Sequence, residues 1–400
     1  MKWEKASIKD ICLGIYDGPH ATPPLSDTGG IFLGIPNFVN GRLDLNNVRY
    51  ISEKDLPKWT KRVTPKENDI VFSYEATLNL YAIIPEGFYG CLGRRMGLLR
   101  VDNSKVFYKF LYYYFFSERW QRVIKENTVL GSTVDRLPLI KFPDFPVFLP
   151  SLQTQYKIAS ILSAYDDLIE NNQKQIKLLE EASHRLYKEW FVDLRFPGHE
   201  DVKVVDGVPE VWESCKLRDV AEINGRNIDE NYPYDKINYI DIGSVRNGRI
   251  LEKANYNLEE APGRAKRIVQ DGDVIWGMVR PNLRAYAMVL NPDKNDVFST
   301  GFAVLTSKKV PFSFLYCSVT TEEFVGYLVN CTNGAAYPAV KPIHFEEYNV
   351  SIPQNNLLNK FHNITEPYFR KIYYLNKQIS SLREARDRLL PKLMSGEIEV

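Results

Sequence analysis

The sequence predicts an α+β protein in which two tandem, strand-rich domains are joined by two long helices that form an antiparallel coiled coil, with an approximate two-fold axis between the halves. Three observations favour this fold: one helical segment occurs twice, weaker similarity runs through the rest of the chain, and a long three-four apolar spacing follows each strand-rich region. The predicted boundaries are 1–150 and 197–353 for the domains and 151–196 and 354–400 for the helices.

The duplicated helix is the clearest of these signals. Residues 172–186 read NQKQIKLLEEASHRL, and residues 375–389, which lie 203 positions later, read LNKQISSLREARDRL. Eight of these fifteen positions carry the same residue. Self-similarity at a fixed spacing is the signature of repeated structural units, so the helix is one member of a duplicated pair.

The strand-rich regions repeat as well, which indicates a duplication of about 200 residues. The offset drifts from 209 to 203, as small changes in loop length would cause. The matching pairs include Trp3-Glu4 with Trp212-Glu213, Asn40-Gly41-Arg42 with Asn247-Gly248-Arg249, DIVF at 69–72 with DVIW at 273–276, FLY at 110–112 with FLY at 314–316, and Leu149-Pro150 with Ile352-Pro353.

Within each copy, short alternating or β-branched runs such as DIVFSY and DVIWGMV predict strands, and NGR and DGD predict turns between them. One helical segment is expected after Val106 and another after Val310. The aromatic run FLYYYFF at 110–116 is expected to be core rather than a base-stacking platform, and it is far too short to span a bilayer.

After Pro150 and Pro353 the apolar pattern changes to that of a heptad repeat. Pro367 is expected to kink the second helix or to delay its start. Asn172 and Gln175 lie on the expected seam and have two interpretations, a polar layer that fixes helix register or a hydrated contact with a third chain. The seam positions are Ile158, Ile161, Tyr165, Leu168, Asn172, Gln175, Leu179, Ala182 and Leu186, and then Phe361, Ile364, Tyr368, Lys371, Leu375, Gln378, Leu382, Ala385 and Leu389.

Composition restricts the class of protein. The chain is 44% apolar and 25% charged, as an ordinary globular protein is. Residues 1–10, MKWEKASIKD, contain no apolar run, so secretion is not expected. Its five cysteines are an odd number and form no CxxC pair, which favours reduced thiols in the cytoplasm and argues against a structural zinc site. The net charge of +1 gives no general sign of nucleic-acid binding.

Motifs for catalysis are missing from the sequence. The glycines Gly87, Gly90 and Gly93 do not have the spacing of a dinucleotide or methyl-donor loop, and Asn291-Pro292-Asp293 lacks the second proline of a DNA-methyltransferase motif. No phosphate-binding GxxxxGK[ST] loop is present. Glu75, which follows a strand, is expected to be a buried or base-reading carboxylate. The chain is therefore expected to be non-catalytic.

Two similar domains related by a two-fold axis suit duplex DNA, whose half-sites dimeric proteins read about 34–36 Å apart. Phrases along the whole chain strengthen this interpretation: DGPHATPP at 17–24, GRRMG at 93–97, GSTVDRL at 131–137, YKEWFVDLRFPG at 187–198, VRPNLRAYA at 279–287 and LLPKLMSGEIEV at 389–400. In these phrases and their order, the chain resembles the DNA-specificity subunits of type I restriction-modification systems.

This resemblance implies two target-recognition domains that read an asymmetric, bipartite site in double-stranded DNA, with a spacer set by the helices. It also implies two methyltransferase subunits docked along the helices and a restriction subunit that acts as a motor. S-adenosylmethionine, ATP and magnesium would then bind to those partners, and this chain would hold no cofactor and contact no membrane.

Residue chemistry predicts candidate DNA contacts, because arginine reads guanine, asparagine reads adenine, and hydroxyl groups bind phosphate. Residues 1–150 carry 20 Lys and Arg against 16 Asp and Glu, whereas residues 200–353 carry 17 against 22, so local clusters must provide the positive charge. The candidates in copy one are His20, Thr22, Arg94, Arg95, Ser132, Thr133 and Arg136. Those in copy two are Arg226, Arg246, Arg280, Asn282, Arg284, Ser299, Thr300, Tyr337 and Lys341.

Two other functions remain as alternatives. An enzyme with its own nuclease or methyl-transfer site would show turnover with the purified chain alone. A scaffold that binds only proteins would lose partner assembly, but not DNA selectivity, when Arg94 and Arg280 are replaced by alanine.

Overall fold

The computed structural model describes residues 3–131, 134–332 and 338–400. The chain divides into two compact units: unit 1 comprises Met1–Glu170 and Ile379–Val400, and unit 2 comprises Asn171–Gln378. Each unit therefore contains one strand-rich domain together with a part of each long helix. The mixture of separate helices and mainly antiparallel sheets confirms the predicted α+β class.

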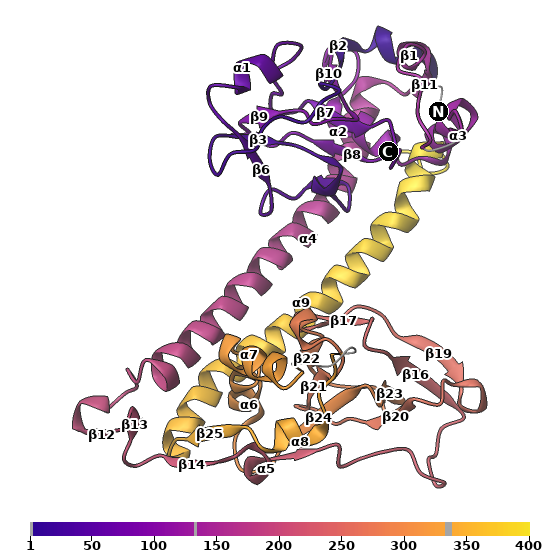
Figure 1. The fold of residues 1–400 in the computed structure, drawn as a ribbon. Helices are drawn as coiled ribbons and strands as arrows, with labels where there is room; N and C mark the ends of the chain where they lie inside the picture. The colour runs from indigo at the N-terminus through magenta and orange to yellow at the C-terminus, as the bar shows by residue number, and fades with distance from the viewer. Residues whose placement is uncertain (1–2, 132–133, 333–337) are drawn as a thin grey trace. The chain divides into compact units, whose positions relative to one another are not determined.

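Unit 1 is built on an antiparallel sheet of four strands in the order β2-β10-β7-β8. These strands and helix α2 are close together in the indigo and violet part of Figure 1. The strands of this sheet are β2 (Cys12–Asp17), β10 (Met96–Val101), β7 (Ile70–Ser73) and β8 (Tyr81–Ile83). The others are β1 (Glu4–Ser7), β3 (Gly30–Phe32), β4 (Phe38–Val39), β5 (Arg42–Leu43), β6 (Arg49–Ile51), β9 (Gly90–Cys91) and β11 (Pro146–Leu149), and the helices are α1 (Leu56–Trp59), α2 (Tyr108–Tyr114) and α3 (Glu118–Asn127).

The core of unit 1 is largely aromatic. Phe110, Tyr114 and Phe115 are fully buried, which confirms that the aromatic run is core. The indole nitrogen of buried Trp120 donates to the hydroxyl group of Tyr81 at 2.8 Å. Both polar groups are thereby satisfied inside the core, as buried Trp and Tyr require.

Unit 2 repeats this architecture with a sheet in the equivalent order β15-β24-β21-β22. The strands of this sheet are β15 (Ala221–Ile223), β24 (Phe302–Ser307), β21 (Val274–Gly277) and β22 (Tyr286–Met288). The others are β12 (Val204–Val205), β13 (Val208–Pro209), β14 (Glu213–Lys216), β16 (Lys236–Ile240), β17 (Val245–Arg246), β18 (Arg249–Ile250), β19 (Ala254–Asn257), β20 (Ala265–Ile268), β23 (Asp296–Ser299) and β25 (Asn349–Ile352), and the helices are α5 (Leu217–Val220), α6 (Phe312–Ser318), α7 (Glu322–Asn330) and α8 (Pro342–Glu346).

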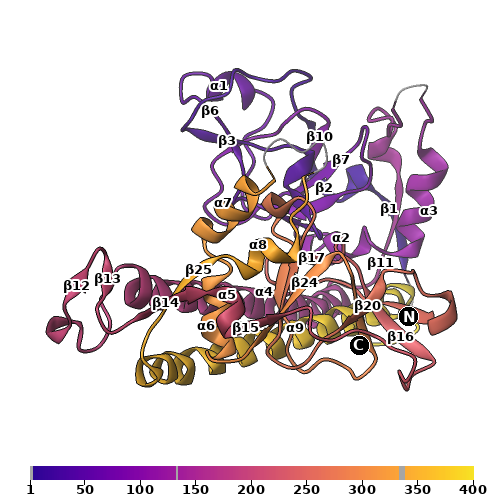
Figure 2. The ribbon, with the colours of Figure 1, turned by 60° about the horizontal axis from the view of Figure 1, so that its bottom comes forward.

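Local details of the two units also correspond. Helix α3 begins with a cap in which the Ser117 hydroxyl accepts from the amide of Trp120, and in α7 the Thr321 hydroxyl accepts from the amide of Phe324. Such caps satisfy amides that have no partner in the first turn of a helix. Helices α7 and α8 lie next to each other (Figure 2). The Tyr327 hydroxyl of α7 donates to a backbone oxygen of α8 at 2.9 Å.

The two long helices are α4 (Leu152–Tyr187) and α9 (Asn355–Ser395). A single π-helical turn, Lys188–Val192, continues α4. Pro367 lies inside α9 with its side chain exposed, and the helix continues through it, so the predicted late start is wrong. In the part of the chain that the structure describes, no helix has the length and apolar character to cross a bilayer.

Within each unit, the parts of α4 and α9 run in opposite directions. In unit 1 the start of α4 packs with the end of α9, since Ile158 and Leu162 share a core with Leu393 and Met394. In unit 2 the end of α4 packs with the start of α9, and the rings of Tyr187 and Phe361 are 6.1 Å apart. The antiparallel arrangement of the two helices is thus confirmed inside each unit.

The predicted seam of each helix consists of two rows, each a series of positions seven residues apart. One row is buried or half-buried as predicted, and the other row lies one residue away from the row that is buried. Positions Ile158, Asn172 and Leu375 are buried as expected, whereas Leu168 and Ala385 are exposed. The wrong row is replaced by the next position along each helix, because a helix that packs against both a domain and a second helix buries a wider face than a simple coiled-coil seam. The residues of the observed row are Leu162, Ile169, Ile176 and Ser183 in α4, and Thr365, Ile372, Ile379 and Arg386 in α9.

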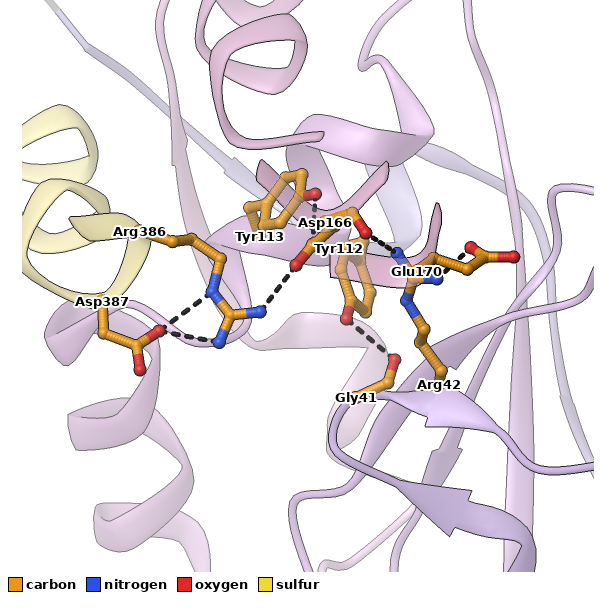
Figure 3. A network of polar contacts seen from close by, with 8 residues as sticks. All are labelled: Gly41, Arg42, Tyr112, Tyr113, Asp166, Glu170, Arg386 and Asp387. Atoms are coloured by element: carbon orange, nitrogen blue, oxygen red, sulfur yellow. Dashed lines mark hydrogen bonds and ion pairs between the residues drawn. The ribbon is translucent and has the colours of Figure 1, made fainter. Parts of the chain in front are cut away.

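The helices also carry polar contacts. In unit 2 the buried Asn172 donates from Nδ2 to Oε1 of Gln378 at 3.3 Å, which supports the interpretation of Asn172 as part of a polar layer that fixes register. In unit 1 a larger network joins α4 to α9 and to the β4–β5 hairpin, and Figure 3 shows its side chains.

Candidate DNA interface

Loops from four parts of unit 1 meet at one edge of its four-stranded sheet. Strands β2 and β7 end at this edge and β10 and β8 begin there, because the strands are antiparallel. Backbone hydrogen bonds join the loops: Gly18 N to Met96 O at 2.8 Å, Tyr74 N to Arg95 O at 3.2 Å, and Leu137 N to Tyr74 O at 2.8 Å. We call this edge the loop edge of unit 1.

The approach of two of these loops requires glycine. A Cβ atom on Gly18 would lie 2.3 Å from the backbone oxygen of Gly93, so no side chain fits there. The glycines in the phrases DGPHATPP and GRRMG therefore let the segment with His20 reach the segment with Arg94 and Arg95. Sequence separation hides this relationship, which only the pairing of β2 with β10 creates.

Asp17 organises the first loop. One of its carboxylate oxygens is 3.0 Å from Nε2 of His20, and the other is 2.6 Å from a guanidinium nitrogen of Arg62. His20 and Thr22 are exposed. Arg62 was missed by sequence reasoning, since its only signal was a Lys-Arg pair in a loop, which is usually a solvated charge.

Arg94 and Arg95 differ in their surroundings. Arg94 is exposed and makes no ion pair with any described residue. Arg95 has a positive φ of 71°, and its Nε lies 3.1 Å from a carboxylate oxygen of Glu75. Arg94 is therefore available to a ligand, whereas Arg95 is held by Glu75.

Tyr74 lies beneath these charges. Burial, together with the nearby negative charges of Asp17 and Glu75, raises the pKa of Tyr74 to about 12, and the cations of Arg62 and Arg94 oppose the shift. Its hydroxyl group has no hydrogen-bond partner among the described residues. Buried polar groups are usually paired, so Tyr74 marks a place where a polar partner would fit.

The last loop of unit 1 brings Arg136 to the same edge. Arg136 is exposed and lies opposite Glu75 in an isolated antiparallel bridge. Ser132 and Thr133 lie outside the described residues. Of the seven candidates in copy one, the structure thus brings His20, Arg94, Arg95 and Arg136 together, with Thr22 two residues after His20.

Unit 2 has an equivalent loop edge. Strand β21 ends there, and the loop with Arg280, Asn282 and Arg284 leads into β22. Backbone bonds tie this loop to its neighbours: Arg280 N to Pro338 O at 2.8 Å, Val340 N to Met278 O at 2.8 Å, and Asn247 N to Arg284 O at 2.9 Å. These bonds place Lys341 next to the segment with Arg280, and the hairpin with Arg246 next to Arg284.

The cations of this edge are again of two kinds. Arg280 is exposed and makes no ion pair with any described residue, and Asn282 and Lys341 are also exposed. Arg284 binds the Glu322 carboxylate with two hydrogen bonds of 2.7 and 2.5 Å. This bidentate contact raises the pKa of Arg284 and lowers the pKa of Glu322.

Three candidates in copy two have other surroundings. Arg226 donates to Asp273 at 2.7 Å and to the Thr306 hydroxyl at 3.1 Å. Asp273 precedes β21 and Arg280 follows it, so Arg226 is held at the end of β21 opposite Arg280. Ser299 is only 2% exposed, and its hydroxyl accepts from the amide of Gly301 at 3.1 Å. Arg226 and Ser299 therefore serve the domain itself. Thr300 is half-buried next to Ser299, and Tyr337 lies outside the described residues.

No group of three or more His, Cys, Asp or Glu side chains that could hold a metal ion occurs within the ranges that the structure describes. The loop edges instead present guanidinium, amide, imidazole and hydroxyl groups. These are donors suited to phosphate oxygens and to the edges of bases.

Comparisons with known proteins show the family to which this chain belongs. The family model described as type I restriction modification DNA specificity domain matches residues 1–181 and 209–380. The chain is 28% identical over 365 residues to the type I restriction enzyme MjaIX specificity subunit of Methanocaldococcus jannaschii, and the match covers 88% of this chain and 82% of that one. The MjaVIII specificity subunit of the same organism is 22% identical over 361 residues, with 88% and 84% covered.

A solved structure shares the fold. The type I restriction-modification system S subunit from M. genitalium matches with a TM-score of 0.63, at 16% identity, over 98% of this chain and 96% of that chain. At this identity the likeness concerns the fold alone. Because the family model covers both halves of the sequence, this chain belongs to the family of type I restriction modification DNA specificity domain proteins.

Proposed function

We propose that this chain is the DNA-recognition subunit of a type I restriction-modification complex, in which unit 1 reads one half of an asymmetric, bipartite duplex site and unit 2 reads the other. One observation carries this proposal. An exposed arginine without an ion-pair partner among the described residues stands at the same edge of the same type of sheet in both units, Arg94 in unit 1 and Arg280 in unit 2. Arginine is the side chain that most often contacts guanine and phosphate.

The proposed interface follows the two loop edges. It excludes Arg226 and Ser299, which are engaged inside their domain, and it adds Arg62, which shares Asp17 with His20. In unit 1 it consists of His20, Thr22, Arg62, Arg94, Arg95 and Arg136. In unit 2 it consists of Arg246, Arg280, Asn282, Arg284, Thr300 and Lys341.

The chemistry would belong to partner subunits. Two methyltransferase subunits would dock along α4 and α9, and a restriction subunit would supply translocation and cleavage. S-adenosylmethionine, ATP and magnesium would bind to those subunits, so this chain would be non-catalytic and work in the cytoplasm beside the DNA. Its family membership supports this division of labour, because the relatives MjaIX and MjaVIII are named specificity subunits.

Methylome sequencing tests the proposal directly. The chain and the methyltransferase encoded beside it would be expressed in a host without DNA methylation. We expect a split, asymmetric motif that is modified on both strands. Arg94→Ala should relax or abolish recognition of one half, and Arg280→Ala of the other.

Two lysines provide matched controls for loss of one exposed positive charge. Lys5 lies on β1, outside the four-stranded sheet, and Lys309 follows β24 at the end opposite the loop edge. Replacing either with alanine should leave the motif unchanged. A stable complex that methylates no defined motif would contradict the proposal and would favour a protein-binding scaffold.

A further inference from the structure

The loop edges of the two units share a backbone framework that is equivalent residue by residue. Ala76 and Arg280 both have positive φ angles, 66° and 50°. Three backbone hydrogen bonds of unit 1 each have a counterpart in unit 2. Tyr74 N to Arg95 O (3.2 Å) corresponds to Met278 N to Gly301 O (2.8 Å). Leu137 N to Tyr74 O corresponds to Val340 N to Met278 O (both 2.8 Å), and Ala76 N to Asp135 O (3.0 Å) corresponds to Arg280 N to Pro338 O (2.8 Å). The bridges Glu75 to Arg136 and Val279 to Ala339 are equivalent as well.

The side chains on this framework are charged in unit 1 and apolar in unit 2. In unit 1 the three positions hold Glu75, Arg95 and Arg136, a charged cluster that we call the floor of unit 1. In unit 2 the same positions hold Val279, Gly301 and Ala339, the floor of unit 2, which has no polar side chain.

The space that Arg95 occupies in unit 1 is closed in unit 2. A Cβ atom on Gly301 would lie 2.4 Å from Cδ1 of Ile242, so this isoleucine fills the position where the arginine side chain would begin. Val279, Ala339 and Ile242 are all half-buried and thus reachable from the surface. The floor of unit 2 is therefore apolar for two reasons. It lacks the charged side chains of unit 1, and Ile242 fills the space next to Gly301 with an apolar group.

We propose that the two floors determine which base pairs each unit prefers. The floor of unit 1 reads a G·C pair, with Arg95 or Arg136 donating to guanine and Glu75 accepting from the amino group of cytosine. The floor of unit 2 reads an A·T pair through the 5-methyl group of thymine, which packs on Val279, Ala339 and Ile242. This inference rests on the proposed function.

Electrostatic interactions favour recognition of a G·C pair by the floor of unit 1. A carboxylate on a surface that faces DNA is repelled by the phosphates, and among base edges it finds donors at the amino groups of cytosine and adenine. The neighbouring arginines favour the G·C pair, because guanine presents two acceptors to a guanidinium group. The Tyr74 hydroxyl is buried and lacks a hydrogen-bond partner among the described residues, and buried Nε of Arg95 contacts Glu75 at 3.1 Å as an ion pair without hydrogen-bond geometry. Unsatisfied groups of this kind gain a partner when a base edge or a bridging water arrives.

The desolvation of base edges favours recognition of an A·T pair by the floor of unit 2. An apolar floor gives no partner to the exocyclic amino or carbonyl group of a base, so a polar edge that is pressed against it loses its hydration without compensation. A thymine methyl group, in contrast, gains from burial there. The floor of unit 2 thus favours thymine and opposes the polar edge of a G·C pair.

Base analogues test the floor of unit 2. The full chain, in complex with its methyltransferase, would first be used to determine both half-sites by selection from random duplexes. Deoxyuridine, which lacks only the 5-methyl group, would then replace each thymidine in turn. At one position of the half-site read by unit 2, binding should weaken about fourfold, as expected for one buried methyl group.

Val279→Ala should remove this sensitivity to deoxyuridine. The control Val205→Ala, an exposed valine on β12, should keep it. If no thymidine of that half-site is sensitive to loss of its methyl group, the inference for unit 2 is wrong.

The isosteric variant Glu75→Gln tests the floor of unit 1. Discrimination at a single G·C pair of its half-site should fall by roughly 5- to 150-fold, the range for one good base contact, while other positions are read as before. An ion pair with Arg95 that served only stability would instead weaken binding to all sequences alike, and that result would overturn the inference for unit 1.

The two levels of proposal can fail separately. If the wild-type complex shows no sequence-selective binding, the proposed function itself is wrong. If it selects a bipartite site but deoxyuridine and Glu75→Gln have no position-specific effect, only the assignment of the floors is wrong.

Discussion

Arg386 of α9 donates to a carboxylate oxygen of Asp166 on α4 at 2.6 Å, although 220 residues separate them. The other oxygen of Asp166 accepts from the Tyr113 hydroxyl at 2.6 Å, and Asp387 binds the far side of the Arg386 guanidinium (Figure 3). The repeat places Phe369 and Ser183 at the equivalent positions of unit 2, where Phe369 packs on the ring of Tyr316 at 5.3 Å. At these equivalent positions an ionic contact therefore joins α4 to α9 in unit 1, whereas in unit 2 the side chain from α9 packs on α6.

Arg386→Ala should destabilise the helix pair in unit 1 by about 3 kcal/mol, because it leaves the buried Asp166 carboxylate without its cation. Hydrogen–deuterium exchange of residues 152–170 and 379–395 would report the loss. Adding Asp166→Asn should recover part of it, since the amide carries no uncompensated charge. The control Arg388→Ala removes a solvent-exposed i,i+4 pair with Glu384 and should change exchange little.

His184 should make the stability of unit 2 depend on pH. Burial lowers the pKa of His184 below its ordinary value of 6.5. The unfolded chain then takes up a proton at a higher pH than the folded chain, so the unfolding free energy should fall as pH decreases from about 6.5 towards the folded-state pKa. Urea unfolding at a series of pH values should show this loss, and His184→Gln should reduce it. Parallel profiles for the two proteins would contradict the prediction.

Glu322→Gln should strengthen non-specific DNA binding. In the free chain the Glu322 carboxylate holds Arg284 in a bidentate contact and competes with phosphate for it. Without that charge, Arg284 can bind a phosphate, and the slope of log affinity against log salt should steepen by about 1. Salt titrations of DNA binding would measure the slope. Glu323→Gln, which removes the adjacent exposed carboxylate on α7, should give a smaller change.

Lengthening both long helices tests the predicted role of the helices in setting the spacer. One heptad inserted between Glu170 and Asn171 and another between Gln378 and Ile379 would fall at the boundary between the units in each helix. Seven helical residues add about 10.5 Å, which corresponds to about three base pairs at 3.4 Å each. Methylome sequencing should show a longer spacer with both half-sites unchanged. An unchanged spacer would exclude the idea that the helices measure it.

Part of the candidate interface could be predicted from residue chemistry. Arg94 and Arg280 lie in short loops between strands, and the structure leaves both exposed at equivalent edges. Arg226 and Ser299 have the same chemistry but are engaged by Asp273 and by a backbone amide. Sequence alone does not separate these cases, because the partner of a charged side chain depends on which strands pair.

The sequence by itself determined the duplication, the α+β class and the two long helices, since these depend on local residue patterns and on identities 203 to 209 positions apart. Tertiary structure decided which helix face is buried, one residue away from the predicted row at positions such as Leu162 and Ile379. It also decided that Glu75 and Val279 occupy equivalent places with opposite chemistry. The physical reason is that burial and charge pairing depend on contacts between segments far apart in the chain, which residue patterns along one segment do not specify.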